Sequence, residues 1–229
     1  MNSNAKFTWP SGKSSAIMLA ESIIDPAICD GLIGECKKYY DSLFSPGPVF
    51  SGLMPSIKFC MDMDFIKDEI ESHGVPSALF SYYEENIVKS LFSAIGYYRE
   101  SFRWLWDWPG LSDSSFRLQH YEKNQGYYRE HIDGGPGPLK AKGRMLGAII
   151  YLNTVDLGGE TFFREHDLRI PARQGSIALF PAYWTHPHQG CVPISDDKWI
   201  ISTFIHREIE EEEYVSVTQM PQVVNEEIL

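Results

Sequence analysis

A histidine and an aspartate stand two residues apart in this chain, as His131 and Asp133. Residues two apart on a β-strand point to the same face, so an extended backbone would bring the imidazole and the carboxylate together. Such a pair supplies two of the three protein ligands of a two-histidine, one-carboxylate iron site, which leaves further positions on the metal open. A surface pair without a metal is the alternative, so the downstream sequence has to decide.

Several downstream segments extend this pair into a larger pattern. Residues 158–163 (GGETFF) follow the apolar residues 147–152, and residues 175–181 (GSIALFP) come next. Residues 185–190 (THPHQG) contain the candidate third ligand, and a lysine follows at position 198. In order and spacing these segments resemble the double-stranded β-helix core of the Fe(II)- and 2-oxoglutarate-dependent oxygenases, most of all the prolyl 4-hydroxylase-like branch. The resemblance extends over residues 116–206.

The resemblance implies a role for each residue of the pattern. It makes His131, Asp133 and His188 the iron ligands and the catalytic residues. It makes Lys198 the cation that pairs with the distal carboxylate of 2-oxoglutarate, and Tyr128 a hydrogen-bond partner of the same carboxylate. A small dianion that enters a cleft needs such a cation, because burial of an unpaired carboxylate is costly. Its 2-oxo acid end can chelate the open positions of the metal.

Ser202 and Thr161 are further candidates for contact with the cosubstrate. Ser202 lies four residues after Lys198 on a predicted strand, so the two side chains share a face. Thr161 shares a face with Phe163 in the same way. Packing in the core is the alternative for Ser202 and for Thr161.

Arg144 and Trp199 are candidates for contact with the substrate. Arg144 opens a predicted strand after a glycine- and proline-rich loop, with a plain surface arginine as the alternative, and Trp199 directly follows the cosubstrate lysine. His186 could also reach the metal, because it lies two residues before His188. The family spacing of about ten residues between the distal histidine and the cationic residue favours His188, which leaves His186 as a neighbour of the site.

Two helices are predicted upstream of this pattern. Asp25 can cap a helix that has Pro26 as its first residue, and apolar residues at helical spacing continue to Phe44. A second amphipathic helix is predicted over residues 77–98. Residues 1–15 are expected to form a loose lead-in, and residues 57–61 favour a strand.

Short apolar segments separated by turn residues predict an all-β unit downstream of residue 108. We expect a mainly β fold with flanking helices, in which a double-stranded β-helix (jelly roll) core is supported by the N-terminal helices. One domain over residues 1–229 would comprise a support region (1–110), the core (111–207) and an acidic tail (208–229). Residues 134–143 predict a loop that acts as a lid. The expected strands are 116–121, 127–133, 145–152, 161–164, 176–180, 186–190 and 199–206.

Composition narrows the classes of partner. A formal charge of −11 argues against a nucleic-acid-binding surface, which needs lysine and arginine. The nucleic-acid-demethylating branch of the family is disfavoured too, because no arginine occurs between His188 and Arg207. The four cysteines form no C-x-x-C pair, which predicts reduced thiols and no zinc ribbon. Without a signal peptide or a long apolar segment, we expect no membrane partner and a cytoplasmic location.

The resemblance implies an Fe(II)- and 2-oxoglutarate-dependent dioxygenase that uses O2 to hydroxylate an unactivated C–H bond. Ascorbate is a further cofactor that it allows. The closest branch suggests a peptidyl proline as substrate, with a free amino acid or another small molecule as the alternative. A non-catalytic β-sandwich binding protein and a zinc hydrolase with the same three ligands are the competing classes. The sequence leaves the oligomeric state open.

Overall fold

The computed structural model describes residues 5–49, 51–102, 111–113, 116–134 and 143–207. They form four α-helices, two 3-10 turns at Lys13–Ser15 and Arg164–His166, and a set of β-strands. The helices are α1 (Pro26–Lys38), α2 (Tyr40–Leu43), α3 (Lys67–Ser72) and α4 (Ala78–Ser101). The strands are β1 (Lys6–Thr8), β2 (Met18–Glu21), β3 (Ser45–Pro46), β4 (Lys58–Phe59), β5 (Met61–Asp64), β6 (Leu111–Asp113), β7 (Arg117–Tyr121), β8 (Tyr127–His131), β9 (Arg144–Tyr151), β10 (Thr161–Phe163), β11 (Leu168–Ile170), β12 (Ser176–Pro181), β13 (His188–Gly190) and β14 (Lys198–Arg207).

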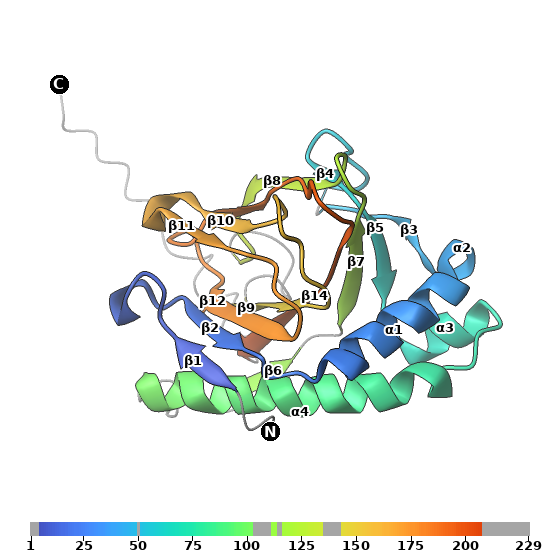
Figure 1. The fold of residues 1–229 in the computed structure, drawn as a ribbon, viewed down its shortest axis with the longest axis horizontal. Helices are drawn as coiled ribbons and strands as arrows, with labels where there is room; N and C mark the ends of the chain where they lie inside the picture. The colour runs from blue at the N-terminus through green and yellow to red at the C-terminus, as the bar shows by residue number, and fades with distance from the viewer. Residues whose placement is uncertain (1–4, 50, 103–110, 114–115, 135–142, 208–229) are drawn as a thin grey trace, which may run out of the picture.

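The strands make two antiparallel sheets that pack face to face (Figure 1). The larger sheet has nine strands in the order β1-β2-β12-β9-β14-β7-β5-β3, with β6 paired to β14. The smaller sheet has five strands in the order β11-β10-β13-β8-β4. From β7 to β14 consecutive strands alternate between the sheets, as in a jelly roll, except that β10 and β11 are paired in the smaller sheet. The expected double-stranded β-helix core with supporting N-terminal helices is confirmed.

Strand β14 shows how the alternation of side chains separates two cores. Trp199 and Ile201 point to the outer face of the larger sheet, where they join the core beneath the helices. Ile200 points to the inner face and joins the core between the two sheets. Lys198 has the same parity as Ile200, so the fold carries a lysine into the space between the sheets.

Helices α1 and α4 cover the outer face of the larger sheet (Figure 1). The Asp25 side chain accepts a hydrogen bond from the backbone N–H of Ala27, which confirms the predicted cap of α1. In α4 the side chains of Phe80 and Leu91 are 1% exposed. Each such side chain stabilises the fold by about 1.5–3 kcal/mol. The Tyr98 hydroxyl donates to the carbonyl of Ala16 and ties α4 to the N-terminal segment.

The N-terminal residues differ from the expected loose lead-in. Strands β1 and β2 extend the larger sheet beside β12, and residues 17–20 are buried. The expectation for residues 1–15 was wrong at β1, because a strand of three residues carries too little periodicity to be predicted. The expected helix to Phe44 is divided at Tyr39, where the backbone leaves the helical conformation (φ −116°).

Residues 57–61 contribute to two strands rather than one. Strand β4 belongs to the smaller sheet and β5 to the larger one, so the chain crosses between the sheets at Cys60. The short elements α3 and β11 were not predicted, since three to six residues carry too little periodicity.

The expected lid over residues 134–143 lies outside the described residues except for its two ends, and the acidic tail lies outside them entirely. The division into one domain stays a prediction. None of the helices that the structure describes has the length and apolar character needed to cross a membrane.

Candidate metal centre and cosubstrate site

Three predicted ligands meet at one end of the smaller sheet. His131 ends β8 and His188 begins β13, and the two are register partners across this antiparallel pair. The ligand atoms of His131, Asp133 and His188 all lie within 4.8 Å of one another. Nε2 of His131 is 3.5 Å from Asp133 Oδ1, and Nε2 of His188 is 3.7 Å from Asp133 Oδ2. The structure therefore brings the three ligands together.

Both imidazoles are oriented by backbone carbonyls. Nδ1 of His131 lies 2.8 Å from the carbonyl oxygen of Arg129, and Nδ1 of His188 lies 3.1 Å from that of His186. A carbonyl oxygen can only accept, so each Nδ1 carries the proton and donates it. Each Nε2 then keeps a lone pair that faces the other ligands, which is the arrangement that metal-binding histidines use.

The pKa values of His188 and Asp133 suit metal coordination. Burial lowers the pKa of His188 to about 4, although the Asp133 carboxylate acts in the other direction. Burial alone would raise the pKa of Asp133, but His188, His131 and Arg144 outweigh it and lower that pKa. At neutral pH His188 is therefore neutral and Asp133 is ionised, as metal coordination requires.

The packing around the ligands explains one glycine. A Cβ on Gly147, in the middle of β9, would lie 2.7 Å from Asp133 Oδ2 and 2.7 Å from the Phe180 ring, so only glycine leaves room for the carboxylate. The rings of Phe180 and Phe163 lie 4.7 Å and 5.2 Å from the His188 ring and keep water from it. Sequence reasoning missed Gly147, for which a glycine inside an apolar strand was the available signal.

Lys198 lies in the interior between the sheets and is 1% exposed. Its ammonium donates to the carbonyl of Gly159 at 3.1 Å and lies 4.6 Å from the centroid of the Tyr121 ring. Within the described part of the chain it forms no ion pair, and burial lowers its pKa to about 8. A buried cation in this state favours an anionic ligand. Tyr121 was not predicted as a site residue, because the strand prediction did not fix which face it occupies.

Tyr128 lies beside His131, one of the three candidate ligands. Its ring stacks on that of His131, with 3.6 Å between centroids and 15° between planes. A Cβ on Gly190 would lie 3.6 Å from the Lys198 ammonium and 3.6 Å from the Cβ of Tyr128, so the ammonium lies near the base of the Tyr128 side chain. Burial, followed by the charge of Asp133, raises the pKa of Tyr128 to about 12, which keeps its hydroxyl a hydrogen-bond donor.

Thr161 also faces this interior. It is 2% exposed, and its Oγ1 accepts a hydrogen bond of 2.8 Å from the Tyr151 hydroxyl. With one lone pair engaged in this way, the Thr161 hydroxyl still has its own proton to donate. Ser202 shares the inner face of β14 with Lys198 and is half-buried. The structure thus leaves both positions compatible with the predicted contacts to the cosubstrate.

Arg144 lies beside the metal centre. One guanidinium nitrogen donates to the carbonyl of Asp133 at 2.9 Å, and the guanidinium carbon lies 3.6 Å from the centroid of the Phe204 ring.

Trp199, the other predicted substrate contact, lies on the opposite side of the larger sheet. It is 3% exposed on the outer face of β14 and stacks on His120 at 4.2 Å, so the structure does not bring it to the site.

His186 is directed away from the ligands. Its Nε2 lies 2.7 Å from the carbonyl oxygen of Ser15 and its Nδ1 lies 2.8 Å from Thr185 Oγ1. Both ring nitrogens are therefore engaged elsewhere, as expected for a neighbour of the site.

Comparison with known proteins agrees with this geometry. The family model of the 2OG-Fe(II) oxygenase superfamily matches residues 116–206, which contain all three ligands and Lys198. Residues 116–206 thus resemble this superfamily, and the curated relatives that match part of the chain are prolyl 4-hydroxylase subunits. Fe(II) and 2-oxoglutarate are the cofactor and cosubstrate of these oxygenases, with O2 as the oxidant. Two imidazoles and one carboxylate form a ligand set that suits Fe(II).

The curated relatives are longer proteins. The α-3 subunit of human prolyl 4-hydroxylase is 31% identical over 97 residues, which cover 35% of this chain and 17% of the human protein. The mouse protein is 30% identical over a match of the same length. The match thus spans less than a fifth of these relatives.

Solved structures share the fold. A collagen prolyl hydroxylase of Paramecium Bursaria Chlorella virus-1, solved with 2-oxoglutarate, has a TM-score of 0.60 at 18% identity. The superposition covers 84% of this chain and 97% of the viral chain. A prolyl hydroxylase of Trichoplax adhaerens has a TM-score of 0.63 at 15% identity. The superposition covers 91% of this chain and 89% of the Trichoplax chain.

Proposed function

We propose that this protein is an Fe(II)- and 2-oxoglutarate-dependent dioxygenase that hydroxylates a peptidyl proline. One observation carries the first part of the proposal: a buried lysine that lacks a described carboxylate partner, Lys198, lies in the same interior as a two-histidine, one-carboxylate cluster. A binding protein or a zinc hydrolase has no need of this additional cation. A dianion that chelates a metal at one end and carries a carboxylate at the other needs both features.

The residues of the chain divide the work as follows. His131, His188 and Asp133 would hold Fe(II), which together with O2 supplies the chemistry that converts 2-oxoglutarate to succinate and CO2 and adds one oxygen atom to the substrate. Lys198 would neutralise the distal carboxylate of 2-oxoglutarate. Tyr128 would donate a hydrogen bond to the same carboxylate and orient His131 through the stacked rings.

The second part of the proposal concerns the substrate. The curated relatives are subunits of prolyl 4-hydroxylase, and the Trichoplax enzyme was solved with a peptide fragment of hypoxia inducible factor. In this chain Arg144 is held beside Asp133 and against the Phe204 ring, so its other guanidinium N–H groups could donate to the carbonyls of a bound peptide.

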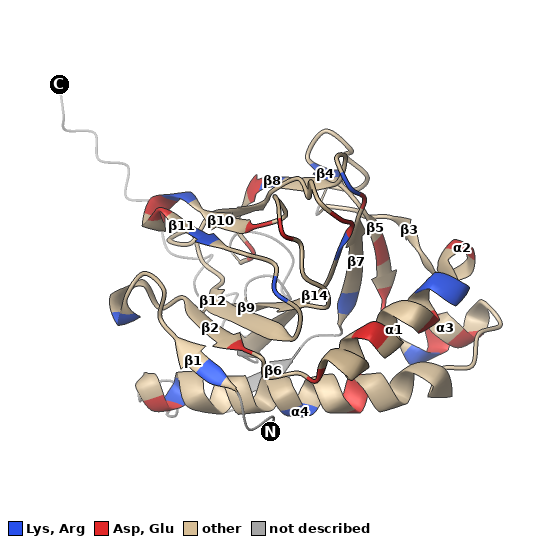
Figure 2. Ribbon diagram, viewed as in Figure 1, with Lys and Arg blue, Asp and Glu red and all other residues tan. Residues whose placement is uncertain are grey.

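The charge of the protein supports a peptide rather than a nucleic acid. The net charge is −11, and Figure 2 shows acidic and basic residues mixed along α1, α3 and α4. A surface that tracks phosphates would instead gather lysine and arginine on one face. We propose no nucleic-acid or membrane partner, and a cytoplasmic location stays a prediction.

Succinate release from 2-oxoglutarate in the presence of Fe(II) and O2 tests the proposal. Proline-containing peptides should stimulate it and gain one oxygen atom, measured by mass spectrometry, and ascorbate should prolong turnover. Lys198→Ala is the matched control, because it keeps the iron ligands. Stimulation by free amino acids but not by peptides would overturn the proposed substrate, and no succinate under any condition would overturn the reaction.

A further inference from the structure

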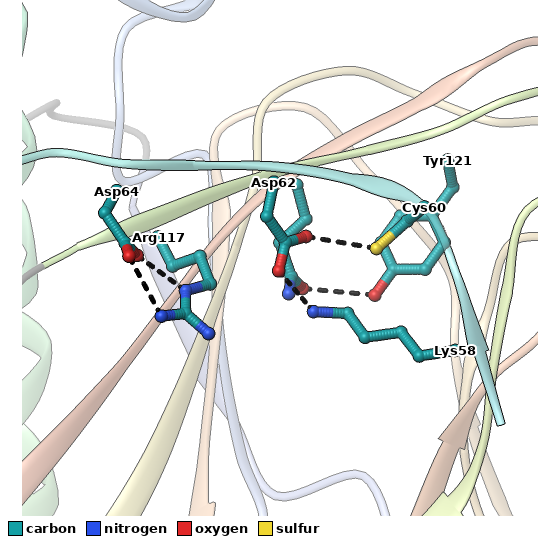
Figure 3. Close-up of polar contacts among 7 residues, drawn as sticks. Lys58, Cys60, Asp62, Asp64, Arg117 and Tyr121 are labelled. Carbon is teal, nitrogen blue, oxygen red and sulfur yellow. Dashed lines mark hydrogen bonds and ion pairs between the residues drawn. The ribbon is translucent and has the colours of Figure 1, made fainter. Parts of the chain in front are cut away.

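A buried ion pair joins the two sheets beside the cosubstrate site (Figure 3). Lys58 belongs to β4 of the smaller sheet and Asp62 to β5 of the larger sheet. Nζ of Lys58 lies 2.5 Å from Asp62 Oδ2, and each residue is 4% exposed. Charges withdrawn from water in this way have to be paired, because the loss of one partner leaves an uncompensated buried charge.

The partners of the two buried lysines distinguish their roles. In the described part of the chain, Lys58 and Lys198 are the lysines that are buried. The charge of Lys58 is balanced by Asp62, whereas the ammonium of Lys198 meets a carbonyl and an aromatic ring. Lys198 is therefore available to an anion from outside, and Lys58 is not a second anchor of this kind.

Lys58 contacts the metal centre through Tyr128. Its ammonium lies 5.4 Å from the centroid of the Tyr128 ring, which is within the range of a cation–π interaction. The backbones of the two residues are register partners across β4 and β8. Since the same ring stacks on His131, a continuous set of contacts runs from the ion pair to an iron ligand.

Asp62 lies near the end of the site that contains Lys198 and Tyr121. Its Oδ1 accepts a hydrogen bond from the Cys60 thiol, and its register partner on β7 is Gln119, which accepts from the Tyr121 hydroxyl (Figure 3). The Tyr121 ring is the one beneath Lys198. Burial chiefly, and then nearby negative charge that includes Asp62, raises the pKa of Tyr121. The Asp62 carboxylate thus stands next to a space that must admit a dianion.

We propose that Lys58 is a positioning residue for the cosubstrate. Its ammonium neutralises Asp62, which would otherwise repel 2-oxoglutarate, and it holds Tyr128 in place. The inference rests on the proposed function and gives a role to a residue outside the matched residues 116–206. The competing role is a clasp between the sheets that affects stability alone.

Two variants of the pair distinguish the positioning role from the clasp, because the positioning role predicts opposite changes in the Kd of 2-oxoglutarate. Lys58→Met keeps the apolar stem but leaves Asp62 unpaired, so it should raise the Kd of 2-oxoglutarate about 10-fold or more. Asp62→Asn keeps the cation, so it should leave that Kd unchanged or lower it. Lys58→Arg keeps the charge and should stay within about 3-fold of the wild type. A clasp would lower the melting temperature of both neutral variants and leave the Kd of the folded protein unaltered.

Calorimetric titration of 2-oxoglutarate into the full chain loaded with Mn(II) gives a readout that does not depend on turnover. In parallel, the KM for 2-oxoglutarate should rise in Lys58→Met more than kcat falls. Arg117→Met is the matched control, because Arg117 pairs with Asp64 between β5 and β7 at 2.6 Å, but the two side chains are 38% and 31% exposed. Its Kd should stay within about 3-fold of the wild type.

Equal Kd values for Lys58→Met and the wild type, or a rise in Asp62→Asn as large as that in Lys58→Met, would overturn the inference. If Lys58→Met does not fold, Asp62→Asn and Lys58→Arg still test it, since a 10-fold rise in either contradicts the expected signs. Failure of the proposed function would look different: the metal-loaded wild type would bind no 2-oxoglutarate at all.

Discussion

His188 stands directly opposite His131 across the antiparallel strands β13 and β8. The register of these strands, rather than the spacing in sequence, sets the distance between the two ligands. Each imidazole is turned by a carbonyl two residues before it, and Asp133 follows where the chain leaves β8. The candidate metal centre is therefore organised by the fold, and substitution of a single candidate ligand should affect metal binding without unfolding the protein.

His188→Ala should lower the affinity for Fe(II) on the order of 100-fold or more, because it removes a ligand whose counterparts stay in place. His186→Ala is the matched control: it removes a buried histidine two residues away that contacts Ser15 and Thr185 instead of the metal. The control should retain Fe(II) within about 10-fold of the wild type. Anaerobic titration with Fe(II) measures both, and full metal binding by His188→Ala would refute the ligand assignment.

Gly147→Ala should weaken metal binding about 10- to 100-fold, since the new Cβ would lie 2.7 Å from Asp133 Oδ2 and displace the carboxylate. Gly190→Ala adds the same methyl group in the same site, yet its Cβ would meet Lys198 and Tyr128 at an ordinary 3.6 Å. The two variants should therefore differ in Fe(II) affinity, measured by the same titration. Equal affinities would show that the carboxylate has room to move.

The sequence predicted the three candidate ligands because their signals are local. His131 and Asp133 lie two apart, and His188 and Lys198 lie in segments whose order is typical of the family. It placed the core strands for a similar reason, since short apolar segments between turn residues need no knowledge of their partners. Trp199 shows why neighbours in sequence need not share a site. It follows Lys198, but side chains alternate along β14, so Trp199 lies in the core beneath the helices and Lys198 between the sheets.

Contacts between distant strands left no such signal. The approach of Gly147 to Asp133, the place of Tyr121 beneath Lys198 and the pairing of β2 with β12 all depend on how the sheets assemble. The two sheets also meet through residues 58–64, where the chain passes from one sheet to the other within a few residues. A prediction from local pattern merges such a crossing into one strand.

Thr161→Val should affect stability and cosubstrate affinity through separate interactions. It leaves the buried Tyr151 hydroxyl without its acceptor, which costs about 1–3 kcal/mol of the free energy of unfolding. The double variant Thr161→Val/Tyr151→Phe also removes the hydroxyl that has lost its acceptor. It should regain much of that free energy of unfolding, measured by urea denaturation. If Thr161 donates to 2-oxoglutarate, the double variant should still bind it about 10-fold more weakly. Wild-type affinity in the double variant would restrict Thr161 to a structural role.

Binding of 2-oxoglutarate should weaken as the pH rises above about 8, because burial lowers the pKa of Lys198 to about 8 and a neutral amine cannot pair with a carboxylate. Nearby Glu160, Cys191 and Cys60 favour the charged form, but burial outweighs them. The bound dianion favours the charged form further, so the pKa of Lys198 is higher in the complex than in the free protein.

A pKa that rises on binding means that the complex takes up a proton above pH 8. Affinity should thus be constant below about pH 7 and fall by up to about 10-fold per pH unit between the free and the bound pKa of Lys198. Calorimetry in two buffers of different ionisation enthalpy measures both the Kd and the proton uptake. Lys198→Arg is the control, since a guanidinium stays charged over this range and should remove the pH dependence of any binding that it retains. A wild-type Kd that stays constant up to about pH 9.5, with no proton uptake, would contradict the assignment of Lys198 as the cation that binds 2-oxoglutarate.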